Sequence, residues 1–195
     1  MSPGSYPAPA GESRGELREK GSRFLAWIGP AADEETAKAA LDRLARQYSD
    51  ASHHCWAWRL GSPPRERSSD AGEPSGTAGV PILQVVRGAG LSDVLAVVVR
   101  WFGGTKLGKG GLARAYAGAA REALAGLPVA QRVPTVRVSL RIPYEKVGAV
   151  KRLIHPPEVE LESEIYTEAA QLVLAVHEER REALREALAD LGIVV

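Results

Sequence analysis

Apolar and polar positions along the chain follow two periods, one typical of strands and one typical of helices. The first two thirds of the sequence predict strands at residues 22–28, 52–60 and 94–102. The last of these runs is apolar on both alternating faces, as expected of a strand in the middle of a sheet. Helical spacing of apolar residues follows Asp33, which favours the N-cap position, and returns over residues 110–127.

Two segments lack such a period. Residues 1–15 are rich in Pro, Gly and Ser and lack the apolar core of a signal peptide, which favours a disordered leader on a cytoplasmic protein. Residues 61–76 combine Pro, Gly, Ser and charge, so they predict a long mobile loop. Thr77 is then the expected cap of a helix that runs to about Gly88.

The last third of the chain has its own order of elements. The predicted order is β-α-β-β-α-β, at residues 137–142, 144–154, 158–165, 171–176, 178–191 and 192–195. In the second of these strands four glutamates alternate with apolar residues, which gives one acidic face and one buried face. This order is that of a ferredoxin-like split sandwich. The sequence therefore predicts an α+β protein of two domains, residues 16–132 and 133–195.

Composition narrows the class of protein. Of the 195 residues, 45% are hydrophobic and 25% are charged, and no apolar run approaches the roughly 20 residues that span a bilayer. A single cysteine, Cys55, excludes an internal disulfide and a cysteine-rich zinc site. Residues 1–132 hold 17 Lys and Arg against 13 Asp and Glu, and residues 133–195 hold 8 against 11, so the net charges are +4 and −3. The basic part favours contact with a polyanion.

The most distinctive stretch is VVVRWFGGTKLGKGGLARAY, which leads from the buried strand into the next helix. It nearly fits a nucleotide-triphosphate loop, but Gly110 stands where a Ser or Thr would bind magnesium, so ATP hydrolysis of that kind is not expected. Unpaired amides and the helix dipole at such a junction favour an anion, while the alternative is a tight turn with incidental basic residues. The predicted anion or nucleic-acid site consists of Arg100, Gly103, Gly104, Lys106, Gly108, Lys109, Gly110, Gly111 and Arg114.

Four residues are candidates for catalysis. Asp70 and Glu73 lie in SDAGEPSGTAG, where either carboxylate could act as an acid or a base, although such residues also cap helices and fill solvated loops. His53 and His54 are adjacent on a predicted strand, so they point to opposite faces and cannot easily bind one ion. Cys55 could be a nucleophile with His53 as its base, but a buried cysteine usually behaves as a small hydrophobe. We predict no metal and no cofactor.

The same segments, taken with KGSRF, HHCWAW and VPIL in their order along the chain, resemble the motifs of the YigZ/IMPACT family. The resemblance runs from about residue 16 to the end. It implies an N-terminal domain with the fold of the second domain of ribosomal protein S-five, and a ferredoxin-like C-terminal domain similar to one in elongation factor G. It also implies a link to translation, because eukaryotic members regulate translational stress signalling through partner proteins and nucleic-acid binding is the usual proposal for bacterial members.

These observations favour a translation-related regulatory protein, or an RNA- or ribosome-binding protein, that uses the basic glycine-rich loop as an anion site. The expected partners are RNA or ribosome-associated factors, with a further protein partner through the C-terminal domain and no membrane. The alternative is an enzyme that acts on a small phosphorylated or otherwise anionic substrate, with Asp70 and Glu73 as acid and base groups. A third class is pure protein interaction.

Overall fold

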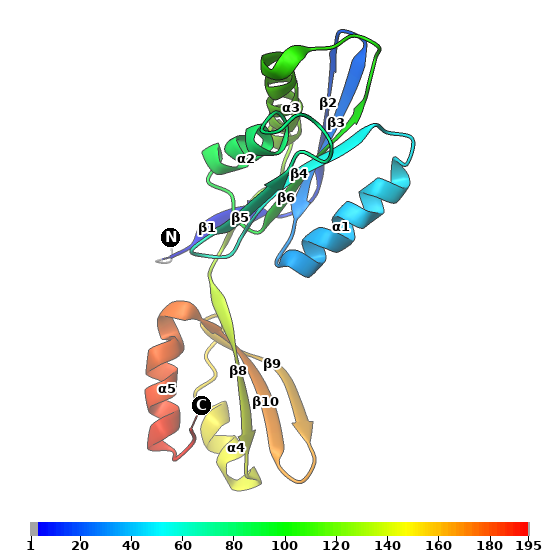
Figure 1. The fold of residues 1–195 in the computed structure, drawn as a ribbon. Coiled ribbons are helices and arrows are strands. Elements are labelled where there is room, and N and C mark those ends of the chain that lie inside the picture. The colour runs from blue at the N-terminus through cyan, green and yellow to red at the C-terminus, as the bar shows by residue number, and fades with distance from the viewer. Residues whose placement is uncertain (1–3, 195) are drawn as a thin grey trace. The chain divides into compact units, whose positions relative to one another are not determined.

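The structure is a computed structural model that describes residues 4–194. The chain forms two compact units, and Figure 1 shows strands and helices in each. Residues 6–132 form the N-terminal unit, and residues 133–194 form the C-terminal unit, with which residues 4 and 5 group. The fold is therefore α+β with two domains, as the sequence predicts.

The N-terminal unit is built on a five-stranded antiparallel sheet. Its strands, in spatial order, are β2 (Ser13–Glu19), β3 (Ser22–Pro30), β6 (Val94–Trp101), β4 (His53–Leu60) and β5 (Arg65–Ser69). All but the last residue of β6 are buried, because its unbroken apolar run lies mid-sheet with both faces covered.

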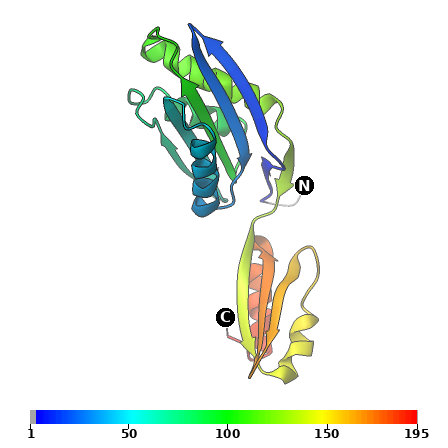
Figure 2. The same ribbon diagram turned by 90° about the vertical axis from the view of Figure 1, so that its right-hand side faces the viewer.

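Three helices cover the two faces of this sheet. Helix α1 (Glu34–Gln47) lies on one face, and α2 (Gly79–Gly88) and α3 (Gly108–Ala125) lie on the other (Figures 1 and 2). The main core lies under α2 and α3, where the Tyr116 ring meets the Phe24 ring edge-on with centroids 5.1 Å apart. This core fixes the start of α3 relative to the ends of β3 and β6.

The caps of the first two helices show one correct and one wrong prediction. Asp33 caps α1, because its Oδ1 accepts the Thr36 amide at 2.8 Å and the two residues complete a capping box. At α2 the Thr77 hydroxyl donates to the Pro74 carbonyl and caps nothing. The carboxylate of Asp70 binds the start of α2 in its place.

The disordered leader predicted for residues 1–15 is wrong from Tyr6 onward, while residues 1–3 lie outside the described residues. Strand β1 (Tyr6–Pro9) pairs with β7 (Val129–Arg132), and β2 follows it. The buried Asp93 carboxylate joins the two paired strands, since it accepts the Tyr6 hydroxyl at 2.7 Å and the Arg132 guanidinium at 2.9 Å. Contacts between residues far apart in sequence therefore order a segment whose composition favours disorder.

The mobile loop predicted for residues 61–76 is also wrong in part. Strand β5 lies within it and pairs with β4 at the edge of the sheet. The Glu66 carboxylate accepts hydrogen bonds from Arg59 on β4 and Arg87 on α2, which fastens this edge. The sequence RERSS shows no apolar alternation because an edge strand can meet solvent along its length.

The C-terminal unit is a three-stranded antiparallel sheet in the order β8-β10-β9, with two helices on one face. Its elements are β8 (Thr135–Ile142), α4 (Tyr144–Lys151), β9 (Val159–Tyr166), β10 (Ala170–His177), the 3₁₀ turn Glu178–Arg180 and α5 (Arg181–Asp190).

The closing strand predicted at residues 192–195 does not form over the described residues 192–194. Gly192 turns the chain with a φ of +67°, and Lys146 holds the carbonyls of Leu191 and Gly192. Ile193 then packs into the core beneath the sheet. Apart from this strand, the predicted order of elements is confirmed.

Candidate anion-binding site

A hollow of about 340 Å³ lies at the start of α3. The glycine-rich loop and the first turn of α3 form one wall, and the loop before α2 and the end of β6 form the other. The residues that line it are Glu73, Pro74, Arg100, Phe102, Lys106, Leu107, Gly108, Lys109 and Leu112. Two parts of the chain that are distant in the sequence, residues 73–74 and residues 100–112, thus meet around one space.

The N-terminus of helix α3, which forms part of one wall of the hollow, has no side-chain cap. Its N-cap is Leu107, whose side chain accepts nothing, and its first turn contains no acidic residue. The first amides of a helix lack partners within the helix and carry the positive end of its dipole. Lys106 and Lys109 are exposed beside them. Both features favour a bound anion.

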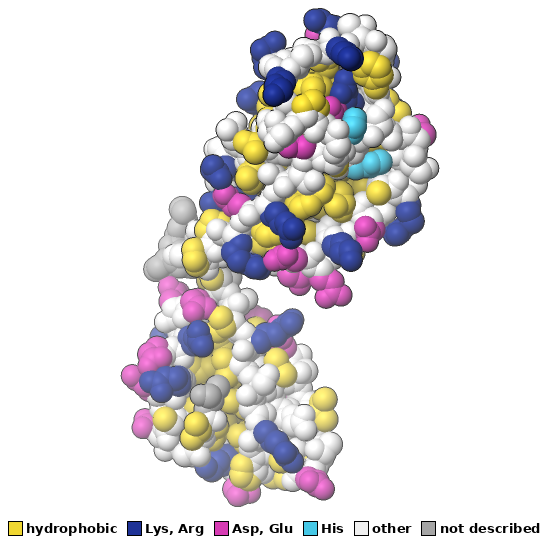
Figure 3. All heavy atoms as spheres, viewed as in Figure 1, with side chains coloured by type: hydrophobic (Ala, Val, Ile, Leu, Met, Phe, Trp, Pro, Cys, Tyr) yellow, Lys and Arg dark blue, Asp and Glu magenta, His cyan; other side chains and the backbone are white. Residues whose placement is uncertain are grey.

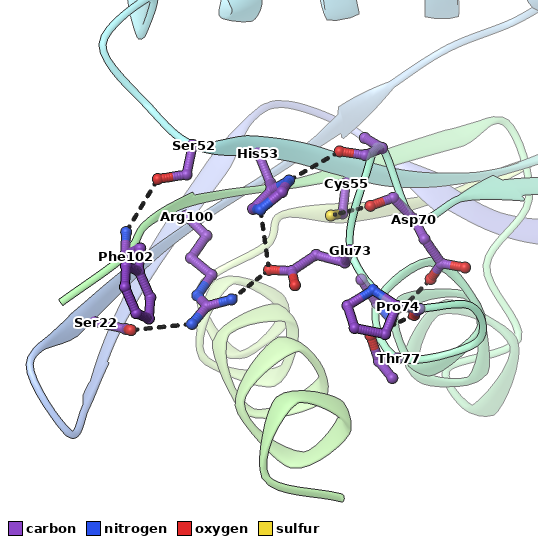
Figure 4. A network of polar contacts seen from close by, with 12 residues as sticks. Ser22, Ser52, His53, Cys55, Asp70, Glu73, Pro74, Thr77, Arg100 and Phe102 are labelled. Carbon is purple, nitrogen blue, oxygen red and sulfur yellow. Dashed lines mark hydrogen bonds and ion pairs between the residues drawn. The ribbon is translucent and has the colours of Figure 1, made fainter. Parts of the chain in front are cut away.

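Glu73 is the centre of a buried polar cluster behind the hollow. Its side chain is only 3% exposed, and its Oε1 accepts the Arg100 Nη1 at 2.5 Å and the Tyr116 hydroxyl at 2.7 Å. The His53 Nε2 lies 3.8 Å from the same oxygen, and Figure 4 shows Arg100 and His53 both directed at this carboxylate. Because Glu73 neutralises Arg100, the net positive charge of the hollow comes from its two lysines.

Arg100 is held from several sides. Its Nη2 donates to the Ser22 hydroxyl at 3.2 Å, and its guanidinium lies over the rings of Phe24 and Phe102, at 5.3 and 5.4 Å from their centroids. Its Nε is buried and has no hydrogen-bond partner among the described residues. Phe102 is 50% exposed, so an aromatic ring stands at the mouth of the hollow.

Asp70 lies near the cluster, but its carboxylate faces the start of α2 (Figure 4). It accepts the amides of Gly76, Ala78 and Gly79 at 2.8 to 2.9 Å. Burial alone would raise the pKa of Asp70, but these three donors outweigh burial and hold the pKa below its ordinary value. An ionised carboxylate with its lone pairs so engaged supports the fold and is poorly placed to move protons.

Cys55 and Tyr116 remain protonated in this environment. The Cys55 thiol donates to the Asp70 carbonyl at 2.9 Å, and burial raises its pKa to about 12 even though the Tyr116 hydroxyl acts to lower it. Burial likewise raises the pKa of Tyr116 far above its ordinary value. A neutral thiol is a weak nucleophile, so the geometry gives no support to covalent catalysis by Cys55.

The two histidines separate as their adjacent positions predict. His53 reaches Glu73 and also contacts the Ala71 carbonyl through Nδ1 at 3.0 Å, whereas the His54 Nε2 contacts the Tyr48 carbonyl at 3.0 Å. Over residues 4–194 there is no group of three or more His, Cys, Asp or Glu side chains that could hold a metal ion.

The glycines of the loop have different surroundings. A Cβ on Gly103 would stand 1.9 Å from the Gly21 carbonyl carbon, so this glycine is needed where two backbones meet. Gly108 lines the hollow, but Gly110, Gly111 and the exposed Arg114 are not part of its wall. Of the residues predicted for the anion site, the lining of the hollow thus includes Arg100, Lys106, Gly108 and Lys109.

Sequence reasoning also missed parts of the site. The sequence pattern predicts Tyr116 only as a member of the apolar stripe of α3. A buried tyrosine hydroxyl nevertheless needs a hydrogen-bond partner, and here that partner is Glu73. Pro74 carries no sequence signal, because its position at the hollow depends on how the loop before α2 packs against residues 100–112. Phe102 lies in the distinctive stretch, but the sequence pattern does not show that its ring is exposed at the hollow.

No helix among residues 4–194 is long and apolar enough to cross a membrane. Lys and Arg side chains gather at the end of the N-terminal unit that carries the β2–β3 hairpin and the start of α3 (Figure 3).

Comparison with known proteins gives matches over both units. Residues 20–124 match the Impact N-terminal domain, and residues 140–192 match a domain of unknown function. A Thermus thermophilus protein, an IMPACT family member encoded in a pol 5' region, is 44% identical over 153 residues, which are 78% of this chain and 83% of the relative. The Escherichia coli IMPACT family member YigZ is 38% identical over 138 residues, which are 69% of this chain and 68% of YigZ. The crystal structure of a hypothetical protein superposes with a TM-score of 0.76 at 30% identity, covering 98% of this chain and 97% of that one.

Proposed function

This chain belongs to the IMPACT family, and from that premise we propose that it is a translation-related regulatory protein that binds RNA at the hollow beside α3. The family supplies the link to translation, since the resemblance to eukaryotic IMPACT proteins implies a regulatory role there. The hollow supplies the groups that would contact the RNA, namely lysine side chains and backbone amides.

One observation carries the proposal. The uncapped start of α3 opens on a hollow whose wall also holds Lys106 and Lys109, while the other charged residues of its described lining, Glu73 and Arg100, neutralise each other. The hollow therefore has a net positive charge and free amide donors, which suit a phosphate group.

RNA is favoured over a free phosphate by the surroundings of the hollow. Phe102 is half exposed at its mouth, where a ring can stack on an unpaired base. Further Lys and Arg side chains gather around the same end of the unit, so a phosphate chain longer than one group would meet positive charge beyond the hollow (Figure 3).

The catalytic alternative has less support. Asp70 is engaged by three backbone amides, Glu73 by Arg100 and Tyr116, and Cys55 is a neutral thiol. None of these groups is free to act as an acid, a base or a nucleophile without first losing the contacts that place it.

The test is the salt dependence of RNA binding. A labelled single-stranded RNA oligonucleotide is titrated with the full chain at several salt concentrations, and its fluorescence anisotropy is followed. Each phosphate contact with a single strand contributes about 0.7 to the slope of log affinity against log salt. We expect Lys106→Glu and Lys109→Glu each to weaken binding and to lower that slope by about this amount.

Arg121→Glu is the matched control, because Arg121 is an exposed cation on the same helix but away from the hollow. It should leave the slope within the error of the wild type. Absence of RNA binding, or equal effects of all three variants, would reject the hollow as the RNA site. If pyrophosphate at millimolar concentration displaces the RNA, and the RNA binds no more tightly than pyrophosphate does, the ligand of the hollow is a small anion.

A further inference from the structure

A second hollow lies along the free edge of the C-terminal sheet. Strand β8 ends the sheet order β8-β10-β9, so it pairs with β10 and with no other strand of the described chain. The outer edge of such a strand presents unpaired N–H and C=O groups at alternate residues. Strand β8 can therefore accept one more strand.

The hollow has a volume of about 450 Å³ and borders this edge. Four consecutive residues of β8, Val136–Ser139, line it together with side chains of α5. Consecutive residues of a strand point to opposite faces, so a hollow lined by four of them lies beside the strand and not above one face of the sheet. It is a groove along the open edge, in the place of a neighbouring strand.

The walls of the groove combine an apolar floor with a basic rim. Val138, Leu184 and Leu188 form the floor, and all three are buried. The rim consists of Arg137, Arg181 and Arg185, whose side chains are 57% to 76% exposed.

Among residues 4–194, no acidic residue lines the groove, and the carboxylates that pair with the rim arginines lie outside the lining. These pairs are Arg137–Glu162, Arg181–Glu178 and Arg185–Glu182. Exposed pairs of this kind are weakly held, so each guanidinium can also receive a carboxylate from a bound molecule.

We propose that this groove binds an extended segment of a partner protein, in which apolar and acidic residues alternate, as a fourth strand beside β8. Backbone hydrogen bonds to the open edge would align the segment, as in other cases of strand addition. Its apolar side chains enter between β8 and α5, and its carboxylates meet the basic rim. The proposal does not depend on RNA binding, since every residue involved belongs to the C-terminal unit.

The probe is a fluorescein-labelled peptide of sequence EVEVEVE with acetylated and amidated ends, titrated with the full chain at low salt. We expect saturable binding by anisotropy, weakened at least tenfold by the double substitution Arg181→Glu and Arg185→Glu. The matched protein control is Arg152→Glu, an exposed cation of the same unit outside the groove, which should bind as the wild type does. The matched peptide control is KVKVKVK, which has the same alternation and the opposite charge.

Hydrogen exchange locates the bound peptide. Addition of EVEVEVE should slow exchange of amides in β8, and the double variant should lose this protection while keeping the circular dichroism and melting temperature of a folded chain. Failure to bind, equal binding of the basic peptide, or protection confined to other elements would overturn the proposal. Self-association of the wild type in sedimentation velocity, lost in the double variant, would make a second copy the occupant and would overturn the assignment to a partner segment.

Discussion

Glu73 and Arg100 form a buried ion pair, with Oε1 and Nη1 2.5 Å apart and side chains only 3% and 6% exposed. The two residues come from different segments, the loop before α2 and the end of β6, and they meet behind the hollow at the start of α3. A charge held in this way is stable only while its partner is present.

Arg100→Met should therefore destabilise the N-terminal unit strongly. It leaves the Glu73 carboxylate buried beside the Tyr116 hydroxyl and the His53 ring, without its guanidinium partner, and the loss of one partner of a buried pair costs about 3–5 kcal/mol. Urea denaturation followed by circular dichroism measures the change in the free energy of unfolding. The double variant Glu73→Gln/Arg100→Met removes the orphaned charge and should lose less than the single variant. Equal losses would show that the two residues are not energetically coupled.

Gly103→Ala should destabilise the same end of the unit for a steric reason. The new Cβ would stand 1.9 Å from the Gly21 carbonyl carbon, and both groups belong to backbones that cannot turn aside, so we expect a loss of about 1–3 kcal/mol or more. The control is Gly88→Ala in the last turn of α2, where a Cβ would meet no described atom within 4 Å beyond its chain neighbours and the backbone of its own helix. That variant should equal or slightly exceed the wild type in melting temperature. A Gly103→Ala protein as stable as the control would contradict the backbone contact.

The elements that sequence reasoning predicts are those whose own residues carry the information. The unbroken apolar run of β6 and the apolar stripe of α3 face a core on a fixed period, so the pattern is visible without the fold. Strands β1, β5 and β7 cannot be predicted from their own residues. Strands β1 and β7 are joined by the distant Asp93, and β5 forms by pairing with the edge of β4.

Only part of the candidate site can likewise be predicted from the sequence. The basic loop before α3 is readable from local spacing, since a strand, glycines and a helix start follow one another in the chain. The opposite wall is not, because Glu73 and Pro74 reach the hollow only through the packing of the loop before α2 against residues 100–112. The role of Asp70 as a cap also escapes local rules, since it lies well before the usual cap position of α2.

Asp70→Asn tests that cap through its dependence on pH. The folded protein holds the pKa of Asp70 below the unfolded value of about 3.9, so the charge adds stability above that pH and the contribution disappears as the pH falls through the folded pKa. At pH 7 the variant should be about 1–2 kcal/mol less stable, because three bonds to a charged acceptor become bonds to a neutral amide.

Denaturant titrations of the wild type and Asp70→Asn from pH 7 to pH 2.5 measure the difference between their free energies of unfolding. This difference should narrow steadily below about pH 4, where the wild-type carboxylate takes up a proton. Asp33→Asn, which alters the exposed cap of α1, is a useful comparison, since Asn is itself a good N-cap and the expected loss is only a few tenths of a kcal/mol. A difference at Asp70 that does not vary with pH would mean that the charge has no part in the cap.

Cys55 provides a last test, because it separates the binding function from covalent catalysis. Its thiol is buried, donates to the Asp70 carbonyl and has a pKa raised by burial to about 12, so at pH 8 only about one molecule in ten thousand carries the thiolate. An unperturbed thiol with a pKa of about 8.5 would be roughly one quarter ionised at the same pH.

Native protein mixed with a disulfide reagent such as Ellman's reagent should therefore react at least a thousandfold more slowly than the same protein in 6 M urea, where the thiol is exposed. The Cys55→Ala variant sets the zero of the measurement in both solutions. Rapid, stoichiometric reaction of the folded wild type would show an accessible thiolate and would restore Cys55, with His53 nearby, as a nucleophile.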